Sequence, residues 1–233
     1  MVRRIYAYLC GDGSHSHQEG PAQGIGVSCW VDVRVLETEY IYHDDYRRPY
    51  DPVEETISHR YQEYKMSSHE TCAPAVPEFM AVIVSLFHGL RIILEEQRKW
   101  NVSHTEIMVK IYSDSVNVLE HLLRQYMQAP WLAIMLQIAR SILFQLTYHH
   151  LYYEFEWIPR EHVFMVDCDT DAVSYREHHY ASFNIHPWLE ARLRNALTQC
   201  SHIKRMLRHE RFHFATSGIK HTNWVYIPAD DQT

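Results

Sequence analysis

The feature that most constrains the fold is a long apolar segment in the first half of the chain. Residues 79–87 are apolar at every position except Ser85, and Pro77 stands just before them. A proline suits the first turn of a helix, where its missing N–H would have had no partner. A helix that is apolar on all sides has to be buried. We therefore expect a helix from Pro77 to about Arg98, packed against a sheet.

Strand patterns surround this helix. We predict strands at residues 5–10, 25–35 and 37–42 before it and at 106–113 and 152–158 after it, with helices at 116–128, 131–146 and 170–179. The order β-β-β-α-β-α-(α)-β-α predicts an α/β domain with a mixed sheet whose first three strands form an antiparallel meander. The polar segment at about residues 44–74 has no clear period and is predicted to be an insertion loop, with a short helix near 54–64.

Charge divides the chain into two unequal parts. Residues 1–182 hold 15 basic and 25 acidic residues, a net charge of −10, whereas residues 183–233 hold seven and four, a net charge of +3. We therefore predict an α/β domain over residues 1–182 and a basic, helical C-terminal extension over 183–233. Arg205 and Arg208 of this extension are candidate phosphate contacts; the alternative is a solvated pair of helices that packs on the core.

Several classes of protein are not expected. Segments without a charged residue, such as 79–90, 129–139 and 141–153, are all shorter than the roughly 20 residues of a membrane span. The N-terminus alternates like a strand and lacks the apolar core of a signal peptide, so we expect an intracellular protein, cytoplasmic or nuclear. Five scattered cysteines without a CxxC pair argue against a disulfide framework and a zinc knuckle.

Four acidic residues lie at predicted strand ends or helix starts. Asp12 follows the first strand, Glu78 lies in the first turn of the apolar helix, Asp114 joins a strand to a helix, and Asp171 begins the last core helix. Singly, each has an ordinary explanation, because such residues also cap helices, favour helix N-termini or form turns. Their order and sequence contexts are more informative.

Those contexts resemble the motifs of the ribonuclease H-like superfamily, from about residue 4 to residue 180. The matching segments are Leu9-Cys10-Gly11-Asp12-Gly13-Ser14 with Gly24-Ile25-Gly26-Val27 ("DGS…GxG"), Ala75-Val76-Pro77-Glu78-Phe79-Met80-Ala81, Ile111-Tyr112-Ser113-Asp114-Ser115 ("(I/V)xSDS"), and Trp157-Ile158-Pro159-Arg160-Glu161-His162 with Thr170-Asp171-Ala172-Val173-Ser174 ("W-(V/I)-P…A-D-x-L-A"). The resemblance implies a five-stranded mixed sheet flanked by helices. It also implies an enzyme that hydrolyses the RNA strand of RNA–DNA hybrids and leaves a 3′-hydroxyl and a 5′-phosphate.

The implied cofactor is a pair of divalent ions, Mg²⁺ or Mn²⁺. Clustered carboxylates repel one another and need a cation to remain charged at neutral pH, and hard oxygen ligands suit these two ions. By resemblance, Asp12 would bridge both ions, Glu78 and Asp114 would hold one, and Asp171 would hold the other. Two ions about 3.5–4 Å apart can activate a water and stabilise the leaving oxygen of a phosphodiester.

The last motif leaves alternatives open. Asp171 fits the Asp-x-apolar-small pattern best, Asp167 fits at a shorter spacing, and Asp169 is interpreted as a bystander. The family often has a histidine before this acid that handles protons or product release. His162 is the nearest candidate, and His15 or His17 could serve instead; the plain alternative is a surface histidine.

Nucleic acid is the expected partner, most simply an RNA–DNA hybrid. Ser14 and Ser115 complete the candidate nucleic-acid-binding residues with Arg205 and Arg208. The alternative function is a ribonuclease H-like module that binds nucleic acid or protein without cleaving it. A 3′–5′ exonuclease of the same superfold is disfavoured, because its first motif resembles Asp-x-Glu, whereas Gly13-Ser14 follows Asp12 here.

Overall fold

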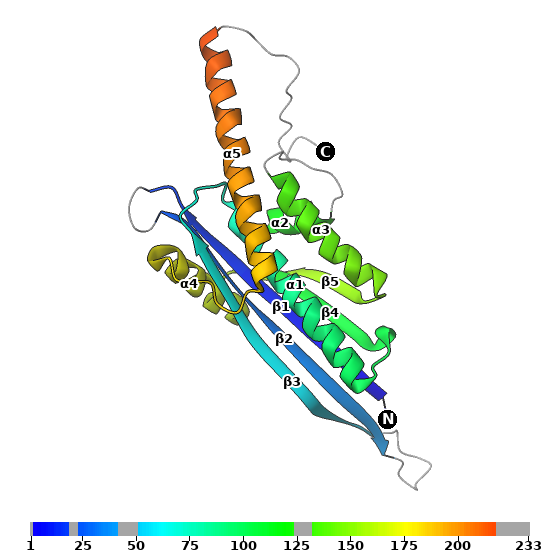
Figure 1. Ribbon diagram of the computed structural model, residues 1–233. Coiled ribbons are helices and arrows are strands. Elements are labelled where there is room, and N and C mark those ends of the chain that lie inside the picture. The colour runs from blue at the N-terminus through cyan, green and yellow to red at the C-terminus, as the bar shows by residue number, and fades with distance from the viewer. Residues whose placement is uncertain (1, 19–22, 42–50, 124–131, 218–233) are drawn as a thin grey trace.

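The computed structural model describes residues 2–18, 23–41, 51–123 and 132–217, with the backbone alone for residues 40, 41, 51, 52 and 204–217. Five strands form one sheet in the order β3-β2-β1-β4-β5 (Figure 1). They are β1 (Val2–Ser16), β2 (Gly24–Ile41), β3 (Asp51–Ser68), β4 (Ile107–Ser113) and β5 (Tyr152–Trp157). The first three strands are antiparallel, β4 runs parallel to β1, and β5 runs parallel to β4. This confirms the predicted fold class, an α/β domain with a five-stranded mixed sheet whose first three strands are antiparallel.

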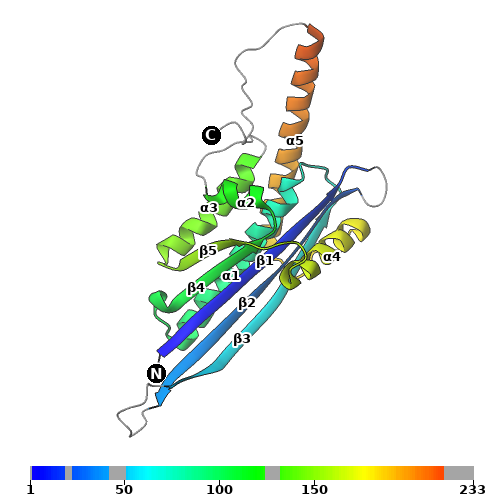
Figure 2. The same ribbon diagram turned by 180° about the vertical axis from the view of Figure 1, so that it is seen from behind.

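Helices cover both faces of the sheet (Figures 1 and 2). The helices are α1 (Ala75–Trp100), α2 (Val116–Leu123), α3 (Ala133–Tyr148), α4 (Val163–His178) and α5 (Pro187–Ser217), with a short 3-10 helix at His104–Glu106. The backbone at Gly11 and Gly13 of β1 faces α1, whereas Ser14 contacts Arg176 of α4. Because neighbouring strand residues point to opposite faces, α1 and α4 lie on opposite sides of the sheet.

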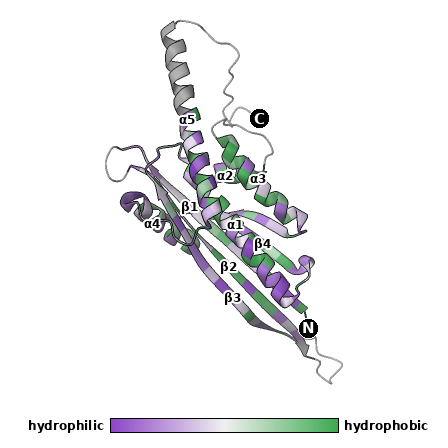
Figure 3. Ribbon diagram, in the orientation of Figure 1, coloured by the Kyte–Doolittle hydropathy of each residue, from purple (hydrophilic) through white to green (hydrophobic). Residues whose placement is uncertain are grey.

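The main hydrophobic core lies between the sheet and α1, α3 and the start of α5. Helix α1 confirms the predicted buried helix, because most residues of its first half are buried. Green, hydrophobic residues alternate with purple ones on the visible part of this helix in Figure 3. Among the described helices it is the one long and apolar enough to cross a membrane, but 78% of its most apolar window is buried inside the domain. A second, smaller apolar cluster lies under α4 and contains Cys10, Trp30, Tyr112, Ile158, Met165 and Cys168.

The predicted insertion loop at residues 44–74 is wrong over residues 51–68, and its residues 44–50 lie outside the described part. Residues 51–68 form the edge strand β3, which pairs with β2 along its whole length, and no helix forms near 54–64. The predicted third strand at 37–42 is instead the end of β2, up to Ile41, and residue 42 lies outside the described part. Most side chains at positions 53–63 are exposed, while Tyr64 and Met66 are buried. An edge strand that is polar over most of its length shows little of the alternation that marks a strand.

The first strand is longer than predicted, so Asp12 lies within β1 rather than beyond it. Gly11 and Gly13 reflect close packing instead of a turn: a Cβ on Gly13 would lie 2.2 Å from the carbonyl carbon of Pro77. The absence of a side chain there lets the first turn of α1 rest directly on the strand. Two acid-bearing elements are thereby brought into contact.

The last two helices also differ from the prediction. Helix α4 begins at Val163, seven residues before the predicted start, so Asp171 lies within it. Helix α5 is continuous, and its side chains Leu189, Leu193 and Leu197 belong to the main core. Residues from 183 onward therefore pack partly with the α/β domain, while the predicted boundary at 182 stays a prediction.

Candidate active site

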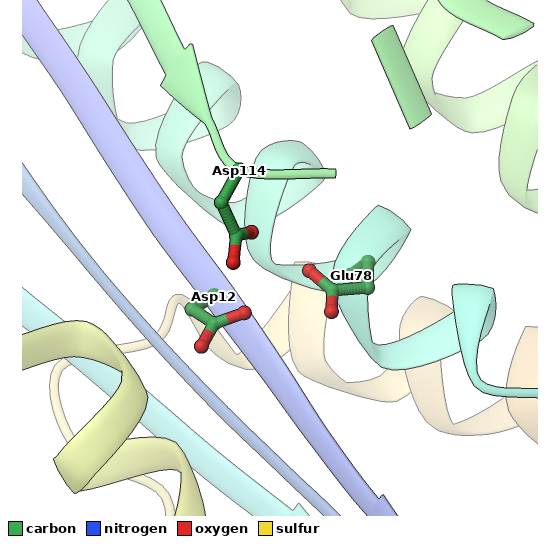
Figure 4. Close-up of side chains that lie close together, drawn as sticks. All are labelled: Asp12, Glu78 and Asp114. Atoms are coloured by element: carbon green, nitrogen blue, oxygen red, sulfur yellow. The ribbon is translucent and has the colours of Figure 1, made fainter. Parts of the chain in front are cut away.

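Three of the four predicted acids converge at one end of β1. Asp12 projects from β1, Glu78 from the first turn of α1, and Asp114 from the residue that follows β4 (Figure 4). One carboxylate oxygen of each lies within 4.8 Å of those of the other two. Asp12 is wholly buried, and the other two are partly buried. Residues that are far apart in sequence thus form a compact cluster of three negative side chains.

The backbone around the cluster orients each side chain. The Gly13 N–H donates a hydrogen bond to Asp12 Oδ1 (2.7 Å), which fixes the orientation of that carboxylate. Trp157, the last residue of β5, donates its indole N–H to the carbonyl oxygen of Asp114 (2.9 Å). The Ser115 N–H donates to Ser113 Oγ (3.1 Å), which shapes the turn from β4 into α2. The cluster therefore stands on the strand β1, the end of β4 and the start of α1, not on a long loop.

Electrostatics work against this arrangement unless a cation is present. Burial, followed by the charge of Asp114, raises the pKa of Asp12 to about 6. Burial and the charges of Asp12 and Asp114 raise the pKa of Glu78 well above its usual range, and burial raises that of Asp114. Each shift records the cost of a negative charge in this place.

The three carboxylates fit a divalent cation. Asp12 Oδ2, Glu78 Oε2 and Asp114 Oδ1 are all buried and have no hydrogen-bond partner within the described residues. Unpaired buried oxygens are unfavourable, and a cation at their meeting point would satisfy all three. An all-oxygen, anionic donor set suits Mg²⁺ or Mn²⁺ rather than a metal that prefers sulfur or imidazole ligands.

The fourth acid beside this cluster is Asp169, not the predicted Asp171. Asp171 forms an ion pair with Lys65 of β3 (2.6 Å) and is not part of the three-carboxylate group. Asp169 accepts a hydrogen bond from Arg160, whose guanidinium also lies 3.8 Å from Asp12 Oδ2. The negative charge of Asp169 is close enough to raise the pKa of Asp12, after the larger effects of burial and Asp114. The aspartate of α4 that lies beside the site is thus Asp169, which the sequence analysis interpreted as a bystander.

The orientation of α4 explains this outcome. Its buried side chains are Met165, Cys168 and Ala172, which face the sheet. Asp169 directly follows Cys168, whereas Asp167 and Asp171, four residues apart, share the face toward β3. A sequence signal was present: Cys168-Asp169-Thr170-Asp171-Ala172 matches the small-Asp-x-x-small part of the closing motif.

The remaining predicted residues lie in different places. His162 is the N-cap of α4, and its Nδ1 accepts a hydrogen bond from the Phe164 N–H (3.2 Å). Ser14 is largely buried and accepts a hydrogen bond from Arg176 (2.8 Å). The side chains of Arg205 and Arg208 lie outside the described residues. Arg160, which no functional prediction included, is the cationic side chain closest to Asp12 among the ion pairs of the described residues.

Comparison with known proteins yields structural neighbours but no sequence match. No protein-family model and no curated protein sequence matches the chain. A ribonuclease H1 isolated from compost by a metagenomic approach is 18% identical, with 73% of this chain and 96% of that chain covered and a TM-score of 0.39.

The second neighbour is the protease-reverse transcriptase of prototype foamy virus. It is 10% identical, with 77% of this chain and 21% of that chain covered and a TM-score of 0.35. This chain thus spans about a fifth of the viral protein. The fold assignment rests on the strand order and strand directions described above.

Proposed function

We propose that this protein is a metal-dependent nuclease of the ribonuclease H type that cleaves the RNA strand of RNA–DNA hybrids. The observation that carries the proposal is the convergence of Asp12, Glu78 and Asp114, whose buried oxygens have no hydrogen-bond partner within the described residues, on a ribonuclease H-like sheet. A carboxylate cluster of this kind is costly to a protein, because each charge is desolvated and repelled by its neighbours. A divalent cation bound among the three carboxylates would offset this electrostatic cost and would give the cluster a catalytic role.

In the proposed site, Asp12, Glu78 and Asp114 would hold one divalent ion. Asp169, in place of Asp171, would be the acid that joins Asp12 in holding a second ion. Two such ions supply an activated water and neutralise the charge that develops on a phosphodiester during hydrolysis. The substrate would approach past the connection from β5 to α4, where Trp157, Arg160 and Val163 are exposed.

Side chains around the carboxylate cluster would position the ligands and the substrate. The hydrogen bond from Trp157 to the carbonyl oxygen of Asp114 keeps that residue aimed at Asp12. His162 remains the proposed proton-handling residue: its Nδ1 is engaged at the N-cap, so its neutral ring carries the proton on Nε2. Since the hydroxyl of Ser14 is already bound by Arg176, Ser115 is the better placed of the two serines to contact a phosphate.

We also propose that the basic extension grips the nucleic acid. Arg205 and Arg208 would pair with backbone phosphates, and each neutralised phosphate steepens the fall of log K with log salt by about 0.9. Reversing both charges should weaken hybrid binding and flatten its salt dependence. Unchanged binding with an unchanged slope would contradict this role.

The test is cleavage of an end-labelled RNA–DNA hybrid in Mg²⁺ or Mn²⁺, with duplex RNA and duplex DNA as competing substrates. The native protein should cut the RNA strand, and Asp114→Asn should reduce cleavage at least 100-fold (roughly the loss of one group that stabilises transition-state charge). Asp32→Asn is the matched control, because Asp32 is a largely buried aspartate that pairs with Arg34 on the same sheet and should keep activity. A folded native protein that binds the hybrid without cutting it would refute the nuclease and favour the non-catalytic binding module.

A further inference from the structure

Arg160 brings its positive charge closest to one side of the carboxylate cluster, the side of Asp12 and Asp169, where it forms ion pairs. Its charge also reaches Asp114, where it lowers the pKa against the larger, opposite effect of burial. Its guanidinium donates a hydrogen bond to Asp169 and lies 3.8 Å from Asp12 Oδ2, so it stands between the two acids of the proposed second ion position. Within the described residues, no lysine or arginine forms an ion pair with Glu78 or Asp114. In the metal-free protein, the ion position between Asp12 and Asp169 is therefore already paired with a cationic side chain. Among the described residues, the position formed by Asp12, Glu78 and Asp114 has its closest cation farther away.

We propose that Arg160 is a built-in counter-cation that occupies the second ion position and must leave it before a second divalent ion can bind between Asp12 and Asp169. The inference rests on the proposed function and assigns a regulatory role to a residue of the same site. It predicts two unequal binding steps. The first ion enters among Asp12, Glu78 and Asp114 without displacing a cation, and the second ion has to compete with the guanidinium.

Arg160 is held in a way that permits release. Its side chain is 58% exposed, and ion pairs of exposed side chains are weakly held in water. It lies in the connection between β5 and α4, directly after Pro159, so it can turn outward without disturbing a helix or strand. A guanidinium also binds phosphate oxygens in a two-pronged geometry, so a nucleic-acid backbone at the site offers it a competing partner. Substrate and second ion should therefore bind cooperatively.

The experiment measures ion binding rather than turnover. Mn²⁺ is titrated calorimetrically into the metal-free full-length protein without nucleic acid, for the native chain, Arg160→Ala, Arg160→Gln and Arg60→Ala. Arg60 is the matched control, since it is an arginine paired with Glu95 on the same sheet, outside the carboxylate group. A charge removed from about 4 Å should tighten the second ion roughly tenfold in both Arg160 variants. The first ion should change much less, and Arg60→Ala should match the native chain.

A second titration uses a hybrid whose RNA strand is 2′-O-methylated and so resists cleavage. It should tighten the second ion strongly in the native protein but weakly in Arg160→Ala, where the competing cation is already gone. Second-ion affinity that is unchanged in both folded Arg160 variants would overturn the inference. If that result accompanies a normal first ion and normal cleavage by the native protein, the proposed nuclease stands. If no variant binds any ion and the native protein does not cleave, both proposals fail.

Discussion

Replacing Asp12 by asparagine should stabilise the metal-free protein at neutral and alkaline pH. The reason is the direction of its pKa shift: burial and the charge of Asp114 raise the pKa of Asp12 from 3.8 to about 6. Between these values the native state holds a proton that the unfolded state has lost. The stability linked to this proton is complete below pH 3.8 and is lost as the pH rises through about 6.

The size of the effect follows from the same two values. A change in pKa from 3.8 to about 6 corresponds to about 3 kcal/mol, which the charged carboxylate costs the native state above pH 6. Asparagine has nearly the same shape, keeps an oxygen that can accept the hydrogen bond from the Gly13 N–H, and can donate toward Glu78. We expect up to about 3 kcal/mol more stability at pH 8, or a rise in Tm of about 6–12 °C for a chain of this size.

The assay is urea or thermal unfolding in EDTA at pH 4.5 and pH 8. Asp12→Asn should be clearly more stable than the native protein at pH 8 and only slightly so at pH 4.5. Asp32→Asn makes the same change on β2, but its carboxylate is paired with Arg34 and His59 (2.7 and 2.8 Å), so that variant should lose about 1 kcal/mol at pH 8. Mg²⁺ should stabilise the native protein at pH 8 and stabilise Asp12→Asn much less.

Two results would refute this reasoning. One is an Asp12→Asn protein that is no more stable than the native chain in EDTA at pH 8. The other is a gain of equal size at both pH values, because a gain unrelated to ionisation would not depend on pH. Either result would mean that the cluster carries little electrostatic strain and would remove the physical argument for a cation there.

Three further predictions test the local geometry. Asp169→Asn should reduce cleavage of an RNA–DNA hybrid at least tenfold, whereas Asp171→Asn, which alters only an ion pair with β3, should stay within about twofold; the reverse ranking would restore the sequence-based assignment. Trp157→Phe should cost about 1 kcal/mol of stability and lower kcat severalfold, because it removes the hydrogen bond to Asp114; urea unfolding and initial rates measure the two effects. Gly13→Ala should cost about 1–3 kcal/mol or more in thermal unfolding, because its Cβ would lie 2.2 Å from the backbone of α1; a neutral change would contradict the close approach.

The sequence was a good guide where one physical effect dominates. The apolar run at 79–87 requires burial whatever surrounds it, and α1 confirms the predicted helix within two residues at each end. It was a poor guide for β3, because most side chains at positions 53–63 are exposed and the strand is held mainly by backbone pairing with β2. Backbone pairing with a neighbouring strand does not require polar and apolar residues to alternate, so an exposed edge strand lacks that sequence pattern.

What the sequence determined by itself is the identity and order of three of the acids, Asp12, Glu78 and Asp114, since their motifs belong to three elements, β1, α1 and the end of β4, that this fold brings together. What only the tertiary structure decided is which aspartate of α4 faces them. The choice of Asp169 over Asp171 depends on the rotation of that helix, which is set by the burial of apolar side chains such as Met165 against the sheet. A turn of about 100° per residue separates neighbouring helix positions, so packing against a distant strand, not local spacing, selects the carboxylate.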